Sequence, residues 1–439
     1  MSTTIIEGVY EIILFPFHLY DGYTHALDVE HNNKNEGGNI IAYSRNYHDN
    51  QKWEIIRAKE NIEYYQIVSQ SCQMAIGVNN ENKIQTQKLN STSNSQFWKI
   101  ENKNNMYMFF NVEKRLYLTV DMDTHNLQLE HLRESDDDNP QLFVLSNAHI
   151  RFLVTADLHI YTKLFHFGSS NQPIDDNTSR FKSMVNNIEK LNPKPQFISI
   201  CGDLTNGTES REEGILKDLI AEIEQTCPVR EGWGNHDMYE HSFSADIGAL
   251  VKERNKVREK NQDCILSDNE EHYYWKHKLG NTTLHFFMLN LVPGYGSTND
   301  RNNNPAKSLD FLKNQIGIIC KKEPIFLFFH THYGATKKWW PEKWKNDFVK
   351  VVQGYNLICS FFGHDHEGNY TKPKFEYVGS PKEGTEINGL RGFLCAGGLG
   401  ENPEYLQVDI SLINQNTELG VNTAINTSSG TFKNIIISL

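Results

Sequence analysis

The chain has 439 residues, of which 38% are hydrophobic and 22% are charged. This length and composition favour two or three folded domains and exclude a small disulfide-stabilised peptide. The formal net charge of −12 argues against a surface that binds nucleic acid or an anionic membrane through bulk positive charge.

A threefold repeat occupies the first third of the chain. Three tripeptides recur at a constant interval, each after a run of short alternating strands: Gln51-Lys52-Trp53, Gln96-Phe97-Trp98 and Gln141-Leu142-Phe143. At matching positions upstream stand Ala26-Leu27-Asp28-Val29, Ala75-Ile76-Gly77-Val78 and Tyr117-Leu118-Thr119-Val120. Because each unit is too small to bury its own apolar face, we expect the three to share one core about a pseudo-threefold axis.

This pattern resembles the β-trefoil of ricin-type lectins, whose repeats close with Gln-x-Trp, over residues 5–146. The resemblance implies an all-β domain at residues 1–147 in which the Trp is structural. It also implies that sugar is held by an Asp early in a repeat, an aromatic platform and an Asn-Gln pair near the end. Repeat one keeps Asp28, Asn50 and Gln51.

The other lectin positions are altered. Repeat one has Ser44 at the platform position with Tyr43 beside it. The later repeats replace the Asp with Gly77 and Thr119, and their platform positions hold Gln87 and Glu130. Two interpretations remain open, a weak glycan site in repeat one or a degenerate trefoil that positions the enzyme or binds another partner, and the losses favour the second.

After Asn147 the sequence pattern changes from short alternating strands to continuous apolar runs that are separated by segments with helical periodicity. Buried strands are predicted at 152–156, 197–201, 325–329 and 357–362, with a short one near Val229. Helices are predicted at 179–191, 212–226, 245–260 and 308–322, the last with Ser308 as N-cap, and hairpins at 272–291 and 375–439. We therefore expect a second domain over residues 148–439, an α/β sandwich of two sheets flanked by helices.

Metal-binding side chains follow five of these strands. The motifs are Asp157-Leu158-His159, Gly202-Asp203, Gly234-Asn235-His236-Asp237, His330-Thr331-His332 and Gly363-His364-Asp365-His366. The carboxyl ends of strands in open α/β sheets border the ligand crevice, so these side chains should converge. An Asp/His/Asn set without Cys suits divalent Mn, Fe or Zn, and a loop-held Asp beside Gly202 can bridge two ions.

The order of motifs resembles the calcineurin-like metallophosphoesterase superfamily over about residues 150–410. The resemblance implies one metal held by Asp157, His159, Asp203 and His366, and a second held by Asp203, Asn235, His330 and His364. It implies that His236 contacts the phosphate and protonates the leaving group, and that Asp237 orients His236. His330 is preferred to His332 because it falls directly at the end of the predicted strand.

The sequence departs from the motifs of two groups within this superfamily, and these departures narrow the part of the superfamily that the chain resembles. Thr205-Asn206-Gly207 and Trp233 stand where phosphoprotein phosphatases carry arginine motifs, which argues against a Ser/Thr phosphatase of that type. Asn206 stands where purple acid phosphatases carry a ligating Tyr. The remainder resembles the branch with acid sphingomyelinase-like and cyclic-nucleotide phosphodiesterase-like enzymes. Aromatic residues beside the motifs form either a substrate wall or core packing: Trp233, Tyr239, Tyr333, Trp339 and Trp340.

The predicted function is hydrolysis of a phosphate mono- or diester by attack of metal-bound hydroxide at a dinuclear site, with the trefoil as a targeting or glycan-binding module. The alternatives are a catalytically inactive lectin-like scaffold and a secreted or injected effector that recognises a host glycan. The seven cysteines show no paired spacing, and neither a signal peptide nor a membrane span is recognised. These features lead us to expect a cytoplasmic protein with reduced thiols, with unconventional secretion left open.

Overall fold

The structure is a computed structural model of the chain, and it describes most of both predicted domains. The described residues are 7–15, 25–59, 61–103, 106–134, 139–160, 178–191, 194–206, 210–238, 247–280, 282–290, 305–331, 342–364, 375–378, 390–394, 405–413, 418–425 and 433–438.

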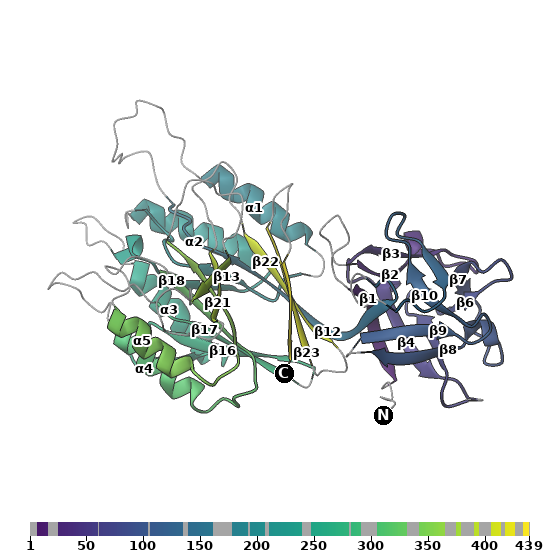
Figure 1. The fold of residues 1–439 in the computed structure, drawn as a ribbon. Helices are drawn as coiled ribbons and strands as arrows, with labels where there is room; N and C mark the ends of the chain where they lie inside the picture. Colours follow the sequence, from purple (N-terminus) through teal and green to yellow (C-terminus); the bar gives the residue numbers. More distant parts are fainter. Residues whose placement is uncertain are drawn as a thin grey trace. The chain divides into compact units, whose positions relative to one another are not determined.

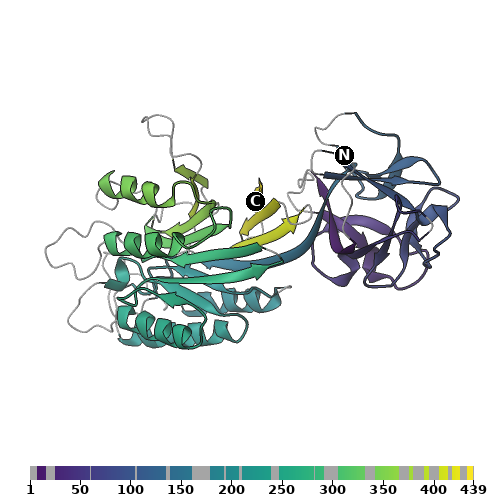
Figure 2. The ribbon, with the colours of Figure 1, turned by 90° about the horizontal axis from the view of Figure 1, so that it is seen from below.

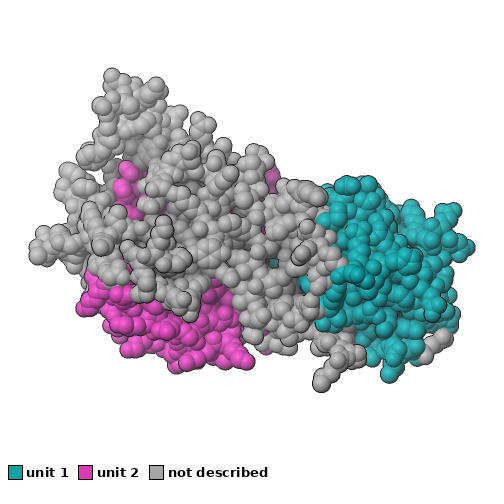
Figure 3. All heavy atoms as spheres, viewed as in Figure 1, with its two compact units in different colours: residues 1–149, 410–422, 432–438 teal, residues 150–409, 423–431, 439 magenta. Residues whose placement is uncertain are grey.

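The chain divides into two compact units, which are coloured separately in Figure 3. Unit 1 contains residues 1–149 with 410–422 and 432–438. Unit 2 contains residues 150–409 with 423–431 and residue 439.

The three sequence repeats carry twelve described strands, four in each repeat. They are β1 (Gly8–Phe15), β2 (His25–Val29), β3 (Ile40–Ser44), β4 (Lys52–Arg57), β5 (Tyr65–Ser69), β6 (Ala75–Val78), β7 (Ile84–Gln87), β8 (Trp98–Lys103), β9 (Met106–Asn111), β10 (Leu116–Val120), β11 (Leu127–Glu130) and β12 (Leu142–Thr155). Antiparallel pairs run from β1 to β4, β5, β8, β9, β12 and back to β1, which closes a six-stranded ring. The other six form three hairpins, β2–β3, β6–β7 and β10–β11. This is the threefold, trefoil-like arrangement that the repeat predicts.

The repeat motif forms the core of unit 1. Trp53, Trp98 and Phe143 are fully buried in one apolar cluster. The indole Nε1–H of Trp53 donates to the Leu27 carbonyl at 2.9 Å, and that of Trp98 donates to the Ile76 carbonyl at 3.0 Å. These acceptors occupy equivalent positions in their repeats, so the motif has the same structural role in both.

Unit 2 begins with parallel strands covered by helices. The second half of β12 pairs in parallel with β13 (Ile198–Cys201), which pairs with β14 (Val229–Gly232). The helices are α1 (Thr178–Lys190), α2 (Ser210–Glu224) and α3 (Ile247–Lys260), and their apolar faces share one core with these strands. The sheet is buried because the crossover helices cover it.

A seven-stranded sheet follows in the order β15-β16-β17-β18-β19-β21-β20. Its strands are β15 (Ile265–Leu266), β16 (Tyr273–Leu279), β17 (Thr282–Met288), β18 (Ile325–Thr331), β19 (Leu357–Gly363), β20 (Phe375–Val378) and β21 (Leu390–Leu394). α4 (Pro305–Ile316) and α5 (Glu342–Val352) pack on it, and Figures 1 and 2 show them on the side of the strands away from α1, α2 and α3. The chain ends with β22 (Leu406–Ile413), β23 (Glu418–Ile425) and β24 (Lys433–Ser438).

Aromatic side chains from different strands of unit 2 pack against one another. The Phe152 ring lies 5.6 Å from that of Phe286 and 5.8 Å from that of Phe361, centroid to centroid, in edge-to-face geometry. The Phe197 ring meets that of Trp275 in the same way at 5.3 Å. Such pairs add to the free energy gained from burying the rings.

Two details differ from the sequence-based expectation. The predicted N-cap, Ser308, lies inside α4, because the helix begins at Pro305, whose fixed φ suits a first helical turn. The Ser308 hydroxyl instead contacts the His272 ring, 3.0 Å from Nε2. Helix α5 was not predicted.

Candidate metal centre

The candidate ligands lie where the parallel strands of unit 2 end. Asp157 and His159 follow β12, Asp203 follows β13 and Asn235 follows β14. From the other sheet come His330, within β18, and His364, directly after β19. Side chains separated by up to 207 positions thus meet at one place, where the His364 amide donates to the Asp157 carboxylate at 3.0 Å.

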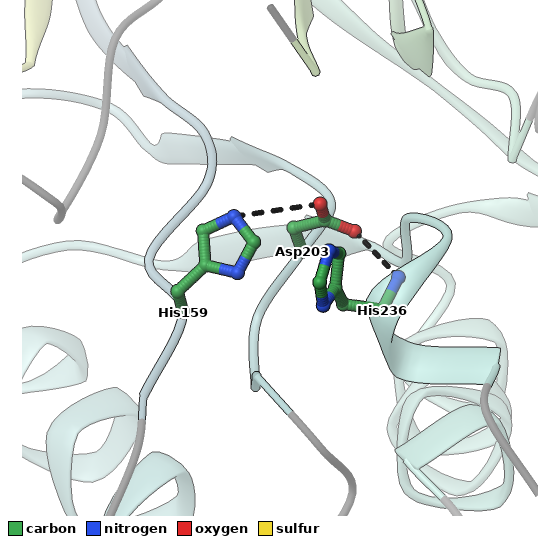
Figure 4. Close-up of side chains that lie close together, drawn as sticks. All are labelled: His159, Asp203 and His236. Atoms are coloured by element: carbon green, nitrogen blue, oxygen red, sulfur yellow. Dashed lines mark hydrogen bonds and ion pairs between the residues drawn. The ribbon is translucent and has the colours of Figure 1, made fainter. Parts of the chain in front are cut away.

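Asp203 lies at the centre of this cluster. One group of potential ligand atoms combines it with His159 and His236, another with Asp157 and His330, and within each group the atoms lie within 4.8 Å of one another. Figure 4 shows the first group, in which Asp203 lies between the two histidines. Its Oδ2 lies 3.5 Å from His159 Nε2, and its Oδ1 accepts a hydrogen bond from the His236 amide at 2.8 Å.

The amide of Asn235 faces two imidazoles. Its Oδ1 lies 3.0 Å from His330 Nε2 and 2.9 Å from His364 Nδ1. His330 Nε2 also lies 3.2 Å from Asp203 Oδ2, while its Nδ1 lies 2.8 Å from the Cys201 carbonyl. Because that carbonyl can only accept, it favours the tautomer with a proton on Nδ1 and leaves Nε2 available to a cation.

This donor set fits divalent cations. These residues are buried except for the partly exposed His364. Asp203 Oδ2 has no hydrogen-bond partner among the described residues, although the Nε2 atoms of His159 and His330 lie 3.5 and 3.2 Å from it. Carboxylate, imidazole and amide donors without sulfur suit Mn, Fe or Zn. A cation shared through Asp203 would satisfy the uncompensated oxygen.

Electrostatics point the same way. Burial and the neighbouring Asp203 raise the pKa of Asp157 to about 7. Burial opposes ionisation of Asp203, but His330 outweighs it and holds the pKa of Asp203 below its usual range. Burial likewise opposes the charge on His330, yet Asp203 raises the pKa of His330 to about 9. Without a cation these carboxylates depend on a charged histidine, a role that a divalent ion takes over.

Glycines allow the loops to approach this closely. Gly202 has φ +85°, and a Cβ there would lie 2.8 Å from His330 Nδ1. A Cβ on Gly234 would lie 2.2 Å from Asp203 Oδ1. A side chain at either position would therefore displace a candidate ligand.

Asp237 links two of the ligand loops. Its carboxylate accepts hydrogen bonds from the amides of Leu204, Thr205 and Gly234 at 2.8–3.0 Å and from the Thr205 hydroxyl at 3.1 Å. Burial and the Asp203 charge raise the pKa of Asp237 to about 6. These contacts hold the loop after β13 against the loop after β14, which positions Asp203 and Asn235.

His236 lies at the more open side of the cluster. Its Nδ1 lies 3.0 Å from the Asn206 carbonyl, so this nitrogen carries a proton and Nε2 is left for a ligand. Its ring lies edge-on to that of His159, with centroids 4.6 Å apart. The arrangement permits either phosphate contact or a third ligand in the group with His159 and Asp203.

Some predicted residues cannot be placed. His366 and the competing His332 lie outside the described residues, as do Tyr239, Tyr333, Trp339 and Trp340. Trp233 is 5% exposed and packs in the core with α1, α2 and α3, so it contributes no substrate wall.

In unit 1, the lectin-like residues of repeat one lie together. Both Asp28 carboxylate oxygens accept from Asn50 Nδ2 at 2.9 Å, and Oδ2 also accepts from Gln51 Nε2 at 2.9 Å and from Asn46 Nδ2 at 3.3 Å. Burial raises the pKa of Asp28, although these amides act against it. The sequence analysis did not identify Asn46, because its side-chain contact with Asp28 depends on how the loop before Gln51 folds.

The Gln of each repeat has a structural role. Gln51, Gln96 and Gln141 donate from Nε2 to the carbonyls of Ser44, Lys88 and His131. Each Oε1 accepts a backbone amide, from Asn46, Asn90 and Arg133. The same two hydrogen bonds thus fix the loop that precedes the Gln in all three repeats, including the two repeats that lack the Asp found in repeat one.

Repeats two and three fill the place of the missing Asp. A Cβ on Gly77 would lie 2.2 Å from Gln87 Oε1, which accepts from Gln96 Nε2 at 3.2 Å. In repeat three the Thr119 hydroxyl accepts from Gln141 Nε2 at 3.0 Å. Only repeat one presents a carboxylate at this position.

Comparison with protein families agrees with both descriptions. Residues 150–368 match the calcineurin-like phosphoesterase family, and residues 19–143 match the ricin-type beta-trefoil lectin domain. The chain combines a calcineurin-like phosphoesterase domain with a ricin-type β-trefoil lectin domain. The candidate metal ligands lie in the first, and the Asp28 cluster lies in the second.

Relatives match the phosphoesterase domain over short segments. The chain is 39% identical to the serine/threonine-protein phosphatase CPPED1 of Danio rerio over 69 residues, 15% of this chain and 22% of that protein. It is 41% identical to the protein of the same name from Mus musculus over 59 residues, 12% of this chain and 19% of that one. The chain therefore matches about a fifth of the length of these relatives.

Solved structures resemble part of the chain. A designed threefold symmetric protein, ThreeFoil, is 20% identical with a TM-score of 0.27, covering 32% of this chain and 98% of its own. The Rhizoctonia solani agglutinin is 15% identical with a TM-score of 0.26, covering 33% and 96%.

Several contributors to the phosphoesterase site carry no sequence signal. The Cys201 and Asn206 carbonyls orient His330 and His236 through backbone atoms that any residue would supply. Asn290 Oδ1 accepts the Trp233 amide at 3.0 Å and so holds the loop that leads to Asn235. Separately, none of the described helices is long and apolar enough to span a membrane.

Proposed function

We propose that the protein is a metal-dependent phosphoesterase that hydrolyses a phosphate mono- or diester at a dinuclear site. The observation that carries this proposal is the position of Asp203, which belongs to both groups of potential ligands. A carboxylate shared by two ions is the element that a dinuclear phosphoesterase needs. The implied ligands are Asp157, His159, Asp203, Asn235, His330, His364 and His366.

In this proposal the phosphoesterase residues hold two divalent ions, with Mn, Fe and Zn the metals that suit the donors. When bound, the ions would supply an acidified water as nucleophile and offset the charge on the phosphoryl oxygens. Asp237 keeps the loops of Asp203 and Asn235 in register through its four acceptor contacts.

His236 is proposed as the general acid. The Asn206 carbonyl fixes the proton on Nδ1, so a second proton on Nε2 is the one that the ring can transfer. Transfer of that proton to the departing alkoxide oxygen avoids release of an unstable anion.

We further propose domain limits of 1–147 for the lectin domain and 148–439 for the phosphoesterase domain, the latter a two-sheet sandwich with helices outside. The two apolar clusters on either side of the strands and the Phe152 contacts support this description. The relatives are named as protein phosphatases, but the proposed chemistry applies to any phosphate ester. A substrate screen should therefore include phosphoproteins, nucleotides and simple diesters.

The test is metal content and turnover with Mn, Fe or Zn on p-nitrophenyl phosphate, bis-p-nitrophenyl phosphate, a nucleotide panel and a phosphopeptide. Asp203→Asn should lose the second equivalent of metal and nearly all activity, because the shared ligand loses the charge that offsets repulsion between the ions. Asp218→Asn, an exposed carboxylate on α2, is the matched control and should behave as wild type. Two bound equivalents and normal turnover in Asp203→Asn would disprove the bridge, while no activity in any arm would favour an inactive scaffold.

A second proposal concerns the lectin domain, where repeat one would bind a glycan through Asp28 and Asn50. The buried carboxylate with its convergent amides supports it, whereas the absence of an aromatic platform at Ser44 predicts weak binding, about millimolar. A glycan array followed by titration should show binding that Asp28→Ala abolishes and that Asp49→Ala, an exposed neighbour, preserves. Binding that survives Asp28→Ala would move the site elsewhere, and no binding to any glycan would leave a structural or docking module.

A further inference from the structure

A cavity lies in the phosphoesterase domain away from the candidate metal ligands. It has a volume of about 360 Å³ and is lined by residues of β14, of α3 and of the end of α2, including Glu224, Arg230, Arg254, Val257, Arg258 and Asp263. No candidate metal ligand among the described residues lines it. The volume is within the range of sites that bind small organic molecules.

Two of its three arginines are neutralised within the fold. Arg254 Nε lies 2.6 Å from Glu231 Oε1, and its NH2 lies 2.6 Å from Glu224 Oε1. Arg258 pairs with the other oxygen of the fully buried Glu231 and also contacts the Asn255 side chain. These charges therefore balance one another and leave little capacity for a ligand.

The third arginine is not paired in this way. Arg230 is 9% exposed, its buried Nε has no hydrogen-bond partner among the described residues, and the nearby carboxylate of Asp263 acts on it only at longer range. The guanidinium of Arg230 lies 5.4 Å from the centre of the Trp275 ring, and burial lowers its pKa. A buried cation without a close counter-ion is costly, so an oxyanion that reached it would gain a strong, geometrically defined pair.

We infer that this cavity binds a small organic molecule carrying one oxyanion group, a carboxylate or a phosphonate-like phosphorus acid, paired with Arg230. Pro228, Val229 and the half-exposed Val257 would contact the carbon body. Glu253 and Asp263 at the solvent-exposed rim would repel a second negative charge. The inference stands apart from the proposed catalysis because it uses none of the metal-binding residues.

Calorimetric titration of the full chain with butyrate and with butylphosphonate, at constant ionic strength, tests the inference and separates the two oxyanion classes. At least one ligand should bind at one site, and Arg230→Gln should weaken it by about tenfold or more, the usual worth of a hydrogen bond to a charged group. Arg211→Gln, an exposed arginine on α2, should leave the affinity unchanged. Asp203→Asn should also leave it unchanged, which excludes binding at the metal centre.

A second variant guards against misfolding of the first. Val257→Trp changes an exposed position and fills the mouth of the cavity without altering Arg230, so it too should abolish binding while the thermal transition is preserved. Equal affinity in wild type, Arg230→Gln and Val257→Trp would overturn the site, as would failure of both ligands to bind the wild-type chain.

Discussion

At the scale of single residues, several candidate metal ligands have a backbone conformation that is unusual for residues other than glycine. Asp157, His159, Asp203 and His364 all have positive φ, at 51°, 42°, 50° and 81°. Non-glycine residues rarely adopt this region, and they persist in it only where surrounding contacts compensate. Here two hydrogen bonds between loops compensate, from the Leu204 amide to the Asp237 carboxylate and from the His364 amide to the Asp157 carboxylate. The strained backbone therefore lies at the proposed functional site.

The role of His236 is testable through the leaving group. His236→Ala should keep the metal content near wild type and reduce turnover of an alkyl phosphate ester by about 10²–10⁴-fold, the usual contribution of a positioned general acid. With p-nitrophenyl phosphate the loss should be smaller, because nitrophenolate departs without a proton. A parallel assay of both substrates on metal-analysed protein decides this. Equal losses on both substrates would leave His236 with phosphate contact alone, and loss of metal would make it a ligand.

At the scale of an element, strand β14 combines two roles. Its carboxyl end leads to Gly234 and Asn235, while Glu231 within it is fully buried and joins Arg254 and Arg258 of α3. Burial opposes the charge on Glu231, but the two arginines outweigh it and keep the pKa of Glu231 below its usual 4.5. The ionised carboxylate thus anchors α3 to the strand that carries the metal loop.

This anchor predicts a pH-dependent stability. Since the pKa of Glu231 is lower in the folded state, its contribution is present above pH 4.5 and is lost as pH falls through the folded value. Glu231→Gln should lower the free energy of unfolding at pH 7 by about 3 kcal/mol, because it leaves two arginines without their shared partner. Urea unfolding at pH 7 and at pH 3.5 measures the difference, which should shrink at the lower pH.

The matched control for this anchor is Glu253→Gln, an exposed glutamate on the same helix that should change the unfolding midpoint little. An unfolding midpoint for Glu231→Gln equal to wild type at pH 7 would contradict the assignment. A difference that grows on acidification would show that the sign of the linkage is wrong.

At the scale of the whole molecule, the candidate ligands that the structure describes and the side chains that position them belong to unit 2, between Asp157 and His364. The Asp28 cluster belongs to unit 1, which has its own apolar core. The proposed boundary at residues 147 and 148 falls inside the 14-residue strand β12 rather than in a loop. The strand pairs with β1 before this point and with β13 after it.

A chain truncated to residues 148–439 should therefore retain metal binding and turnover of small model esters close to the full-length values, because the proposed chemistry uses only unit 2. The comparison is a steady-state assay of both chains at equal metal content. The truncated Asp203→Asn variant supplies the inactive control. A soluble, folded truncated chain without activity would mean that the first 147 residues contribute to the catalytic pocket.

The sequence by itself determined the features that repeat or recur in a fixed order. The 45-residue spacing of Gln51, Gln96 and Gln141 predicted the trefoil-like unit, since identical core positions in three repeats leave few alternative arrangements. The apolar runs and motifs after residue 147 predicted the parallel strands and brought Asp157, Asp203, Asn235, His330 and His364 to one edge. The trefoil and phosphoesterase families are thus confirmed, while the ligand roles of these side chains stay a prediction.

Tertiary structure alone decided the contacts that join distant segments. The four hydrogen bonds of Asp237, the carbonyl of Asn206 behind His236 and the location of Ser308 inside α4 depend on how loops pack, which local patterns do not encode. The unpaired Nε of Arg230 among the described residues is likewise visible only once Glu224 and Glu231 are seen to be engaged by Arg254 and Arg258. Charge compensation in a folded interior is a property of neighbours in space, so it appears only when α2, α3 and β14 are assembled.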